Sequence, residues 1–311
     1  MSAPIPVLCI VGPTASGKTA LSVELAKRTD GEIVSADSMQ IYKGMDIASA
    51  KPTKEEMNGI LHHMMDFLSP EIPYSVAQYT QAAGICIREI AAREKLPIVV
   101  GGTGLYVDSL LSHTQFVEAP TDMALRAELD AEYETVGGAE MLRKLSVFDP
   151  ESAERLHPNN KKRILRAFEI YRLTGQTLTA ALEQSHAVPS PFRPVYIGIA
   201  FRDRAVLYDR INRRVEDMLA SGLLEEARAF YKGNPETAAQ AIGYKELKPF
   251  LDGVLPLTDA VENLKRATRN YAKRQITWFK RNEQIHWLYA DECTPEQLLV
   301  QALEIADEAK R

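Results

Sequence analysis

The segment Gly12–Thr19, with the sequence GPTASGKT, constrains the fold of this chain more than any other stretch. It fits the pattern G-x-x-x-x-G-K-[ST] in full, follows the apolar run Ile5–Val11 and precedes helix-like sequence at 18–29. In such a strand–loop–helix unit the glycines let backbone N–H groups curl around a phosphate, and the helix N-terminus adds positive potential. The lysine supplies a point charge, and the threonine hydroxyl can hold Mg²⁺. The pattern therefore predicts a ligand with a di- or triphosphate group, without saying which one.

Apolar runs alternate with helix-like segments on both sides of this loop. The alternation predicts an α/β fold with a mainly parallel, P-loop NTPase-like sheet and helices on both faces. Ligands of such sheets bind outside the carboxyl ends of the strands. We expect three strand ends to meet there in one crevice: Gly12–Thr19, Asp37–Gln40 and Gly101–Thr103. The predicted strands are 5–11, 32–36, 96–100, 195–201 and 285–289.

From about Pro120 to Val188 the sequence has a helical pattern throughout. We therefore predict a helical insertion domain at 120–188, set into a catalytic core formed by 1–119 and 189–311. The proline-rich segment SHAVPSPFRP marks the return to the core. The insertion is predicted to contain helices at 121–135, 137–146, 150–157, 159–174 and 177–184. The core is predicted to contain helices at 18–29, 74–94, 204–221, 222–232, 237–251, 257–281 and 294–309.

The formal net charge of −5 argues by itself against a nucleic-acid partner, but the charges are segregated. Six basic residues between Arg155 and Arg172 accompany a single acid, and seven between Glu262 and Arg281 accompany one glutamate. Because a partner feels the local field, two such stretches on an acidic body can still bind a polyanion.

The sequence shows no signal peptide and no apolar segment of membrane-spanning length. We therefore expect a cytoplasmic protein with no membrane partner. The three cysteines are far apart and odd in number, which predicts reduced, structural thiols.

Two polar residues at predicted strand ends are candidates for chemistry. The position of Asp37 leaves three roles open: a general base, a Mg²⁺ ligand through water, or a helix N-cap. Thr103, in the sequence GGTG, could hydrogen-bond a diphosphate oxygen or cap the helix that follows. Both sets of alternatives stay open from the residues alone.

A third candidate is the basic stretch 264–275, in which Arg266, Arg269 and Lys273 share one face of a helix. Such a face is either solvated or turned towards phosphate groups. The adjacent histidines His62 and His63 have a spacing that favours a structural role over metal binding.

Seven blocks of sequence occur in order along the chain: GPTASGKT, VSADSMQIYKGMDIASAKP, HHMMD, VVGGTGLY, HPNNKKRILRAFEIYRLTGQTLT, AIGYKEL and TRNYAKRQITWFKR. Together they closely resemble the bacterial tRNA dimethylallyltransferases, or tRNA isopentenyltransferases, from about residue 7 to residue 285. The resemblance implies transfer of a dimethylallyl group from dimethylallyl diphosphate to the N6 amine of the adenosine 3′ of the anticodon. The implied tRNAs read codons that start with U, and the products are N6-(dimethylallyl)adenosine and diphosphate.

The resemblance also implies Mg²⁺ as cofactor and roles for single residues. Asp37 would be the general base, Thr103 would hydrogen-bond the leaving group, and Lys18 with Arg269 would neutralise it. The diphosphate would lie on Gly12, Pro13, Thr14, Ala15, Ser16, Gly17, Lys18 and Thr19, together with Arg269. Thr19 would be the ligand of the metal.

For the tRNA partner, the resemblance implies that the helical insertion clamps the anticodon stem-loop. The implied contacts are Asp37, Ser38, Met39, Gln40, Thr103, Lys162, Arg163, Arg166, Gly243, Tyr244, Lys245 and Arg274. Lys162 stands where many relatives have glutamine, so the basic character is kept but a base-specific contact is not implied. We expect the protein to act as a monomer.

Three other functions are compatible with parts of the pattern. A small-molecule kinase would use the loop, Asp37 and ATP, but would leave the basic-edged insertion without a role. A prenyltransferase acting on free AMP or ADP would not need the KKRILR and AIGYKEL segments. A nucleotide-dependent RNA-binding protein would form no product at all.

Overall fold

The computed structural model describes residues 3–114, 116, 122–186, 188–232 and 241–310. The chain divides into two compact units, Met1–Leu111 together with Pro191–Arg311, and Ser112–Ser190. The first unit is an α/β domain and the second is helical. No helix in the described ranges has the combined length and apolar character that crossing a bilayer demands.

One sheet forms the centre of the α/β unit, and every strand pairing in it is parallel. Within the described residues it has six strands in the order β3-β2-β4-β1-β5-β6. Their bounds are β1 (Ile5–Val11), β2 (Gly31–Ser35), β3 (His62–His63), β4 (Leu96–Gly101), β5 (Phe192–Ala200) and β6 (Ile285–Tyr289). The predicted parallel α/β fold is confirmed, and β3, which is too short to show a periodic pattern, is an addition to it.

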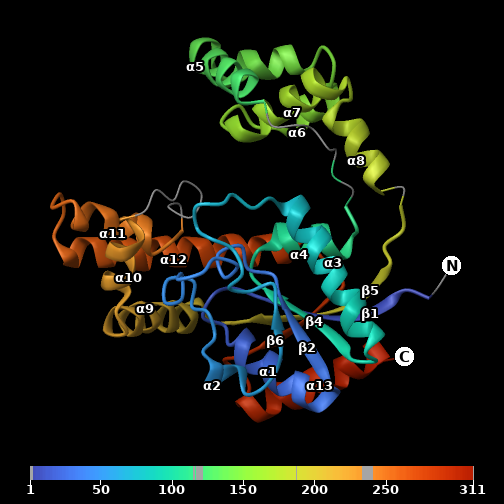
Figure 1. Cartoon of the computed structure of the whole chain (residues 1–311), viewed down its shortest axis with the longest axis vertical. Helices are drawn as coiled ribbons and strands as arrows, with labels where there is room; N and C mark the ends of the chain where they lie inside the picture. The colour runs from blue at the N-terminus through green and yellow to red at the C-terminus, as the bar shows by residue number, and fades with distance from the viewer. Residues whose placement is uncertain (1–2, 115, 117–121, 187, 233–240, 311) are drawn as a thin grey trace. The chain divides into compact units, whose positions relative to one another are not determined.

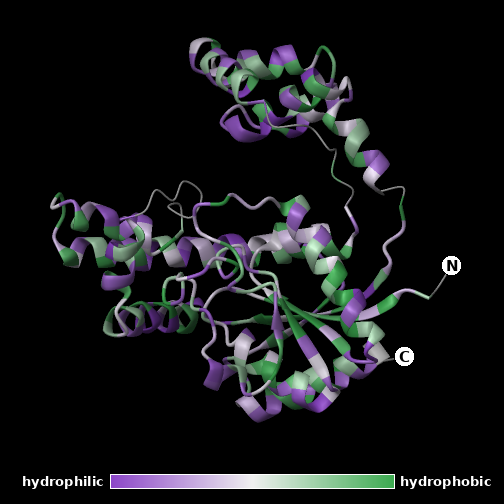
Figure 2. Cartoon of the chain, viewed as in Figure 1, coloured by the Kyte–Doolittle hydropathy of each residue, from purple (hydrophilic) through white to green (hydrophobic). Residues whose placement is uncertain are grey.

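The continuous apolar sequence of β1 follows from burial on both faces of the sheet. Val7, Cys9 and Val11 pack against α3 (Val76–Ala92) and α4 (Gly104–Leu111). The alternate residues Leu8 and Ile10 pack against α1 (Lys18–Thr29) and α13 (Pro295–Lys310). Figure 1 shows these two pairs of helices on opposite sides of the sheet, and Figure 2 shows the strands between them as largely hydrophobic.

Strand β5 begins at Phe192, three residues before the predicted start at 195, although the added segment contains a proline. It pairs with β1 from Phe192 onwards, and Pro194 lies opposite Val7. Pairing with β6 starts only at Tyr196. Pro194 therefore lies where β5 has a single paired neighbour, which is where a strand tolerates a residue without an N–H group.

A second group of helices in the same unit packs around a core of its own. These helices are α9 (Arg204–Ala220), α10 (Leu223–Phe230), α11 (Tyr244–Leu251) and α12 (Leu257–Phe279). The short helix α2 (Lys54–Met57) belongs to the same unit but not to this group. Their core also includes Ile41, Tyr42 and Met45 from the loop after β2. The helix predicted at 237–251 begins only at Tyr244, since residues 241–243 form a bend and turn; residues 237–240 lie outside the described residues.

The helical unit contains α5 (Met123–Leu145), α6 (Pro150–Arg155), α7 (Lys161–Thr174) and α8 (Leu178–His186). Its core is formed by Leu129, Met141, Leu145, Ile164, Leu165, Ala167 and Phe168. The backbone leaves the helical conformation at Gly137, with φ 79° and ψ 160°, so α5 is two helices joined at a kink. The sequence pattern predicted two helices at 121–135 and 137–146, and the break falls at the first residue of the second one.

The buried carboxylate of Asp149 generates a prediction for this unit. It accepts hydrogen bonds from the N–H of Ser152 at 3.1 Å, the N–H of Thr179 at 3.1 Å and the Thr179 hydroxyl at 2.6 Å. We expect Asp149→Ala to lower the free energy of unfolding of the helical unit by about 2 kcal/mol, because a helix cap and a buried acceptor are lost together. Hydrogen exchange of the α6 and α8 amides measures the change. The exposed Glu154→Ala serves as the control, and equal effects of the two variants would contradict the assignment.

Candidate active site

The phosphate-binding loop occupies the turn between β1 and α1. At Gly12 the backbone has φ 149°, and a Cβ atom there would lie 2.6 Å from the carbonyl oxygen of Ile199. Helix α1 starts after Gly17, and no side chain caps its N-terminus. The hydroxyl of Ser16 is buried and has no hydrogen-bond partner among the described residues. Unpaired donors at a helix N-terminus form an anion site, and the geometry is that of a phosphate cradle.

Lys18 lies folded against this loop, where its Nζ donates to the carbonyl oxygen of Pro13 at 2.7 Å. Burial lowers the pKa of Lys18 to about 7; nearby Arg214 lowers the pKa further, and Asp37 opposes the change. The amine is therefore poised to gain a proton when an anion enters the cradle, since an adjacent negative charge favours the ammonium form.

The strand ends predicted to meet do so, because β2, β4 and β1 are neighbours in the sheet. Gly101 has no space for a side chain, since a Cβ atom would lie 2.2 Å from the carbonyl oxygen of Ala36. Beyond it, the N–H of Thr103 donates to the same Ala36 oxygen at 3.2 Å, and the Thr103 hydroxyl accepts from the N–H of Ser38 at 3.1 Å. The loops after β2 and β4 are thus bonded together beside the cradle.

Asp37 uses one carboxylate oxygen for structure. Its Oδ1 accepts from the N–H of Met39 at 2.8 Å and that of Gln40 at 3.4 Å. Burial raises the pKa of Asp37, while these two bonds, Lys18 and Arg214 act in the opposite direction. Within the described residues the other oxygen, Oδ2, has no hydrogen bond or ion pair, so it is available to a substrate. Asp37 therefore caps the following turn and still has a free oxygen for a substrate.

Helix α12 bonds to two loops of the site through Gln275, a residue that was not predicted from the sequence. The buried Gln275 accepts from the N–H of Thr14 at 2.8 Å and donates to the carbonyl oxygen of Gly102 at 3.0 Å. One amide thereby joins the cradle, the loop after β4 and α12. Tyr271 lies one turn earlier, beside Thr103, and burial raises its pKa to about 12. A neutral amide within a basic stretch carries no sequence signal of such a role.

Helix α9 supplies two arginines, Arg210 and Arg214, that were not predicted from the sequence. Nε of Arg210 donates to the carbonyl oxygen of Ala15 at 3.0 Å. Arg214, one turn further on, is close enough to influence the pKa of both Lys18 and Asp37. Their spacing of four residues, which puts both arginines on one face of a helix, was the sequence signal that could have identified them. The predicted Arg269 lies on α12, and its Nη1 donates to the side chain of Asn212 on α9 at 2.6 Å.

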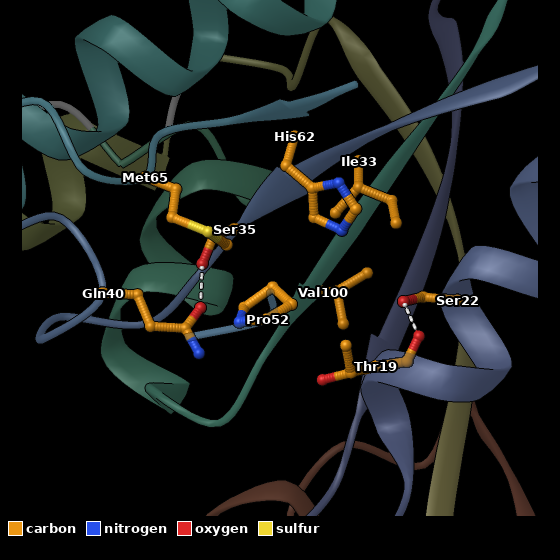
Figure 3. Close-up of a pocket in the computed structure, with 9 residues that line it drawn as sticks. All are labelled: Thr19, Ser22, Ile33, Ser35, Gln40, Pro52, His62, Met65 and Val100. Atoms are coloured by element: carbon orange, nitrogen blue, oxygen red, sulfur yellow. Dashed lines mark hydrogen bonds between the residues drawn. The ribbon is translucent and has the colours of Figure 1, made fainter. Parts of the chain in front are cut away.

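Thr19 lies at the first turn of α1, on a cavity of about 20 Å³ behind the cradle. Figure 3 shows its side chain across that cavity from Gln40 and His62. Nδ1 of His62 lies 2.9 Å from the carbonyl oxygen of Ile60, and its Nε2 is buried without a partner among the described residues. His63 lies 2.7 Å from Glu32, which fits the structural role expected for the pair.

The other residues selected from the sequence are spread over both units. Lys245 and Arg274 are exposed, whereas Tyr244 is fully buried and its hydroxyl donates to Glu226. In the helical unit, Lys162 and Arg163 are exposed at the start of α7 and have no ion pair among the described residues. Arg166 pairs there with Glu169 at 3.2 Å, and Glu169 also binds Arg126.

A phosphate cradle with an adjacent carboxylate and several cations, at the carboxyl ends of a parallel sheet, defines an enzyme of the P-loop class that acts on a phosphorylated substrate. Comparison with known proteins narrows this class. The family model described as IPP transferase matches residues 40–282. The chain belongs to this family.

Individual relatives agree with this assignment. A tRNA dimethylallyltransferase of Thermoanaerobacter sp. (strain X514) is 45% identical over 292 residues, which are 93% of each protein. The solved structure of a full-length tRNA isopentenylpyrophosphate transferase from Bacillus halodurans is similar with a TM-score of 0.73 at 42% identity, covering 98% of this chain and 96% of that one. A eukaryotic dimethylallyltransferase solved acting on tRNA has a TM-score of 0.83 at 28% identity, covering 97% and 78%.

The lowered pKa of Lys18 predicts that anion binding takes up a proton. Near pH 8 the free amine is mostly neutral, and a bound diphosphate should raise its pKa and charge it; near pH 6 it is already charged. Calorimetry with magnesium pyrophosphate, in buffers of different ionisation enthalpy, should show about one more proton taken up at pH 8 than at pH 6. In Lys18→Arg this difference should vanish, because a guanidinium stays charged throughout. An identical pH dependence in both proteins would refute the prediction.

Proposed function

We propose that this protein transfers the dimethylallyl group of dimethylallyl diphosphate to the N6 amine of the adenosine 3′ of the anticodon, in tRNAs that read codons starting with U. The products are N6-(dimethylallyl)adenosine and diphosphate. The observation that carries the proposal is membership of the IPP transferase family together with a cradle, a lysine and a carboxylate at one set of strand ends. The same membership favours prenyl transfer over the kinase and over a protein that forms no product.

The cradle stabilises the leaving diphosphate. Breaking the allylic C–O bond leaves negative charge on the diphosphate and positive charge shared over the allyl unit. Backbone N–H groups of 15–19 at the α1 N-terminus, together with Lys18, are fixed before the reaction at the place where that negative charge grows. Arg214 and Arg269 extend this positive field, and the Thr103 hydroxyl contributes a hydrogen bond to the leaving group.

Mg²⁺ fits the donor chemistry of the cradle. The Thr19 hydroxyl and diphosphate oxygens are the hard ligands this ion prefers, and it keeps water molecules in its remaining positions. Within the described residues no group of three or more His, Cys, Asp or Glu side chains is arranged to hold a metal. A site made of one hydroxyl and the substrate's own oxygens needs no such group. When bound, the ion neutralises charge on the leaving diphosphate.

Asp37 is the base that the amine requires. The exocyclic amine of adenine is a weak nucleophile because its lone pair is delocalised into the ring. Oδ1 of Asp37 is held by the turn, so Oδ2 can accept the amine proton as the new N–C bond forms. Because the base must leave its stack to reach this carboxylate, an unpaired adenosine in an anticodon loop suits the site.

Binding of tRNA is assigned to residues in both units. Ser38, Met39 and Gln40 form the turn that Asp37 caps, and Gly243 packs against Ala48 in the loop that Gln40 contacts. Lys245 and Arg274 are exposed cations of the α/β unit. In the helical unit the exposed Lys162 and Arg163, with Arg166, provide positive charge for the phosphates of an anticodon stem-loop. We propose that the protein acts as a monomer.

Mass spectrometry of nucleosides tests the proposal directly. The protein is incubated with tRNA, Mg²⁺ and dimethylallyl diphosphate, and the tRNA is then digested. One C₅H₈ unit should appear on adenosine in tRNAs that read codons beginning with U, and chelation of Mg²⁺ should suppress it. Parallel reactions with ATP and with free AMP as substrates separate the kinase and the free-nucleotide alternatives. Unmodified tRNA under conditions that support pyrophosphate binding would overturn the proposal.

Asp37→Asn gives the sharpest test of the base. Asparagine keeps a side-chain oxygen for the Met39 and Gln40 N–H groups but is not basic at neutral pH. We expect kcat to fall about 10²–10⁴-fold while the affinity for tRNA and for pyrophosphate stays nearly unchanged. Single-turnover kinetics and filter binding measure the two effects separately. A loss of tRNA affinity as large as the loss of rate would identify Asp37 mainly as a tRNA contact.

A further inference from the structure

We propose that Glu226 is a positioning residue for tRNA, which holds the loop 46–50 and through it the segment Ser38–Gln40. This inference rests on the proposed function, since it concerns the same tRNA-binding segment. Glu226 lies on α10, outside the cradle and outside every motif identified in the sequence.

The carboxylate of Glu226 accepts four hydrogen bonds. Oε2 accepts from the N–H groups of Asp46 at 2.9 Å and Ile47 at 2.8 Å. Oε1 accepts from the N–H of Ala48 at 2.9 Å and from the Tyr244 hydroxyl at 2.8 Å. Three successive backbone N–H groups that converge in this way form a concave anion site, and here the anion is a side chain of the protein itself.

The loop held by Glu226 in turn holds Gln40. Nε2 of Gln40 donates to the carbonyl oxygens of Ser49 and Ala50, each at 3.3 Å. Its Oε1 accepts from the Ser35 hydroxyl at 3.0 Å, at the end of β2. Both ends of the Gln40 amide are therefore occupied, one by the strand and the other by the loop. Displacement of the loop would release the side chain and the backbone turn that Asp37 caps.

The same contacts explain the position of the AIGYKEL segment. The start of α11 packs on the loop, because a Cβ atom on Gly243 would lie 3.2 Å from the Cβ of Ala48. Tyr244 is fully buried and presents its hydroxyl to Glu226, and hydrogen bonding with this carboxylate adds to the burial that raises the pKa of Tyr244. Tyr244 acts on tRNA through this support, because its side chain has no exposed surface.

A carboxylate is required at this position, and glutamine is not an adequate replacement. If the amide NH₂ replaced Oε2, it would face the two N–H donors of Asp46 and Ile47. If it replaced Oε1, the Tyr244 hydroxyl could rotate to accept from it, but the N–H of Ala48 would lose its acceptor. Either orientation leaves at least one backbone donor unpaired, so Glu226→Gln disturbs the loop with almost no change in volume.

Steady-state kinetics of the full-length protein with Mg²⁺ test the inference. In Glu226→Gln and Glu226→Ala we expect the KM for tRNA to rise about tenfold or more, because a displaced contact segment costs binding far from the chemistry. The KM for dimethylallyl diphosphate should stay within about twofold, since the hydrogen bonds of Glu226 go to residues 46–48 and Tyr244 and not to the cradle. Tyr244→Phe keeps the three N–H bonds and should have a smaller effect than Glu226→Ala.

Glu225→Gln is the matched control, because the neighbouring Glu225 is exposed and pairs only with Arg228 among the described residues, at 3.4 Å. It should leave both KM values unchanged. Hydrogen exchange of the amides 46–48 gives a readout independent of turnover, and these amides should lose protection in Glu226→Gln but not in Glu225→Gln. Unchanged protection, or an equal rise in both KM values, would overturn the inference. Failure of the proposed function is distinguishable, because wild-type protein and the Glu225→Gln control would then form no product.

Discussion

The parallel pairing of β2, β4 and β1 is the constraint on which the rest of the site depends. Three neighbouring strands that run in one direction must release their loops at one edge of the sheet, which is where such sheets bind their ligands. The buried amide of Gln275 then closes the arrangement, since it bonds to the cradle at Thr14 and to the loop after β4 at Gly102. Without that amide the two loops would present unpaired backbone groups to each other.

Charge in the site is arranged to receive an anion. The cradle, Lys18 and the arginines of α9 and α12 concentrate positive potential in a protein whose net charge is −5. Burial lowers the pKa of Lys18 to about 7, and the nearby Arg214 of α9 lowers it further. The negative Asp37 offsets part of the repulsion and at the same time caps the turn that carries Ser38–Gln40. One carboxylate thus links the electrostatics of the cradle to the segment that we propose as a tRNA contact.

A second carboxylate, that of Glu226, holds the loop that supports the segment Ser38–Gln40. Glu226 bonds to the loop after β2 and to α11, and it places two chemically different segments, DIASA and AIGYKEL, against each other. The phosphate side of the site is therefore built from backbone N–H groups aimed at a ligand. The side that we propose for tRNA also has converging backbone N–H groups, but these bind the carboxylate of Glu226 and hold the loop 46–50 in place.

Elements with a local signal could be predicted from the amino-acid sequence alone. The cradle follows from the spacing within Gly12–Thr19, the buried strands from apolar runs, and the division of α5 into two helices from the separate helical patterns at 121–135 and 137–146. Gln275 and Glu226, whose partners are far away in the sequence, could be identified only in the folded structure. Gln275 bonds to a residue 261 positions away, and Glu226 to residues about 180 positions away. Side chains at such separations show no periodicity or spacing with their partners, because their proximity arises from the order of the strands and the packing of α10 and α12.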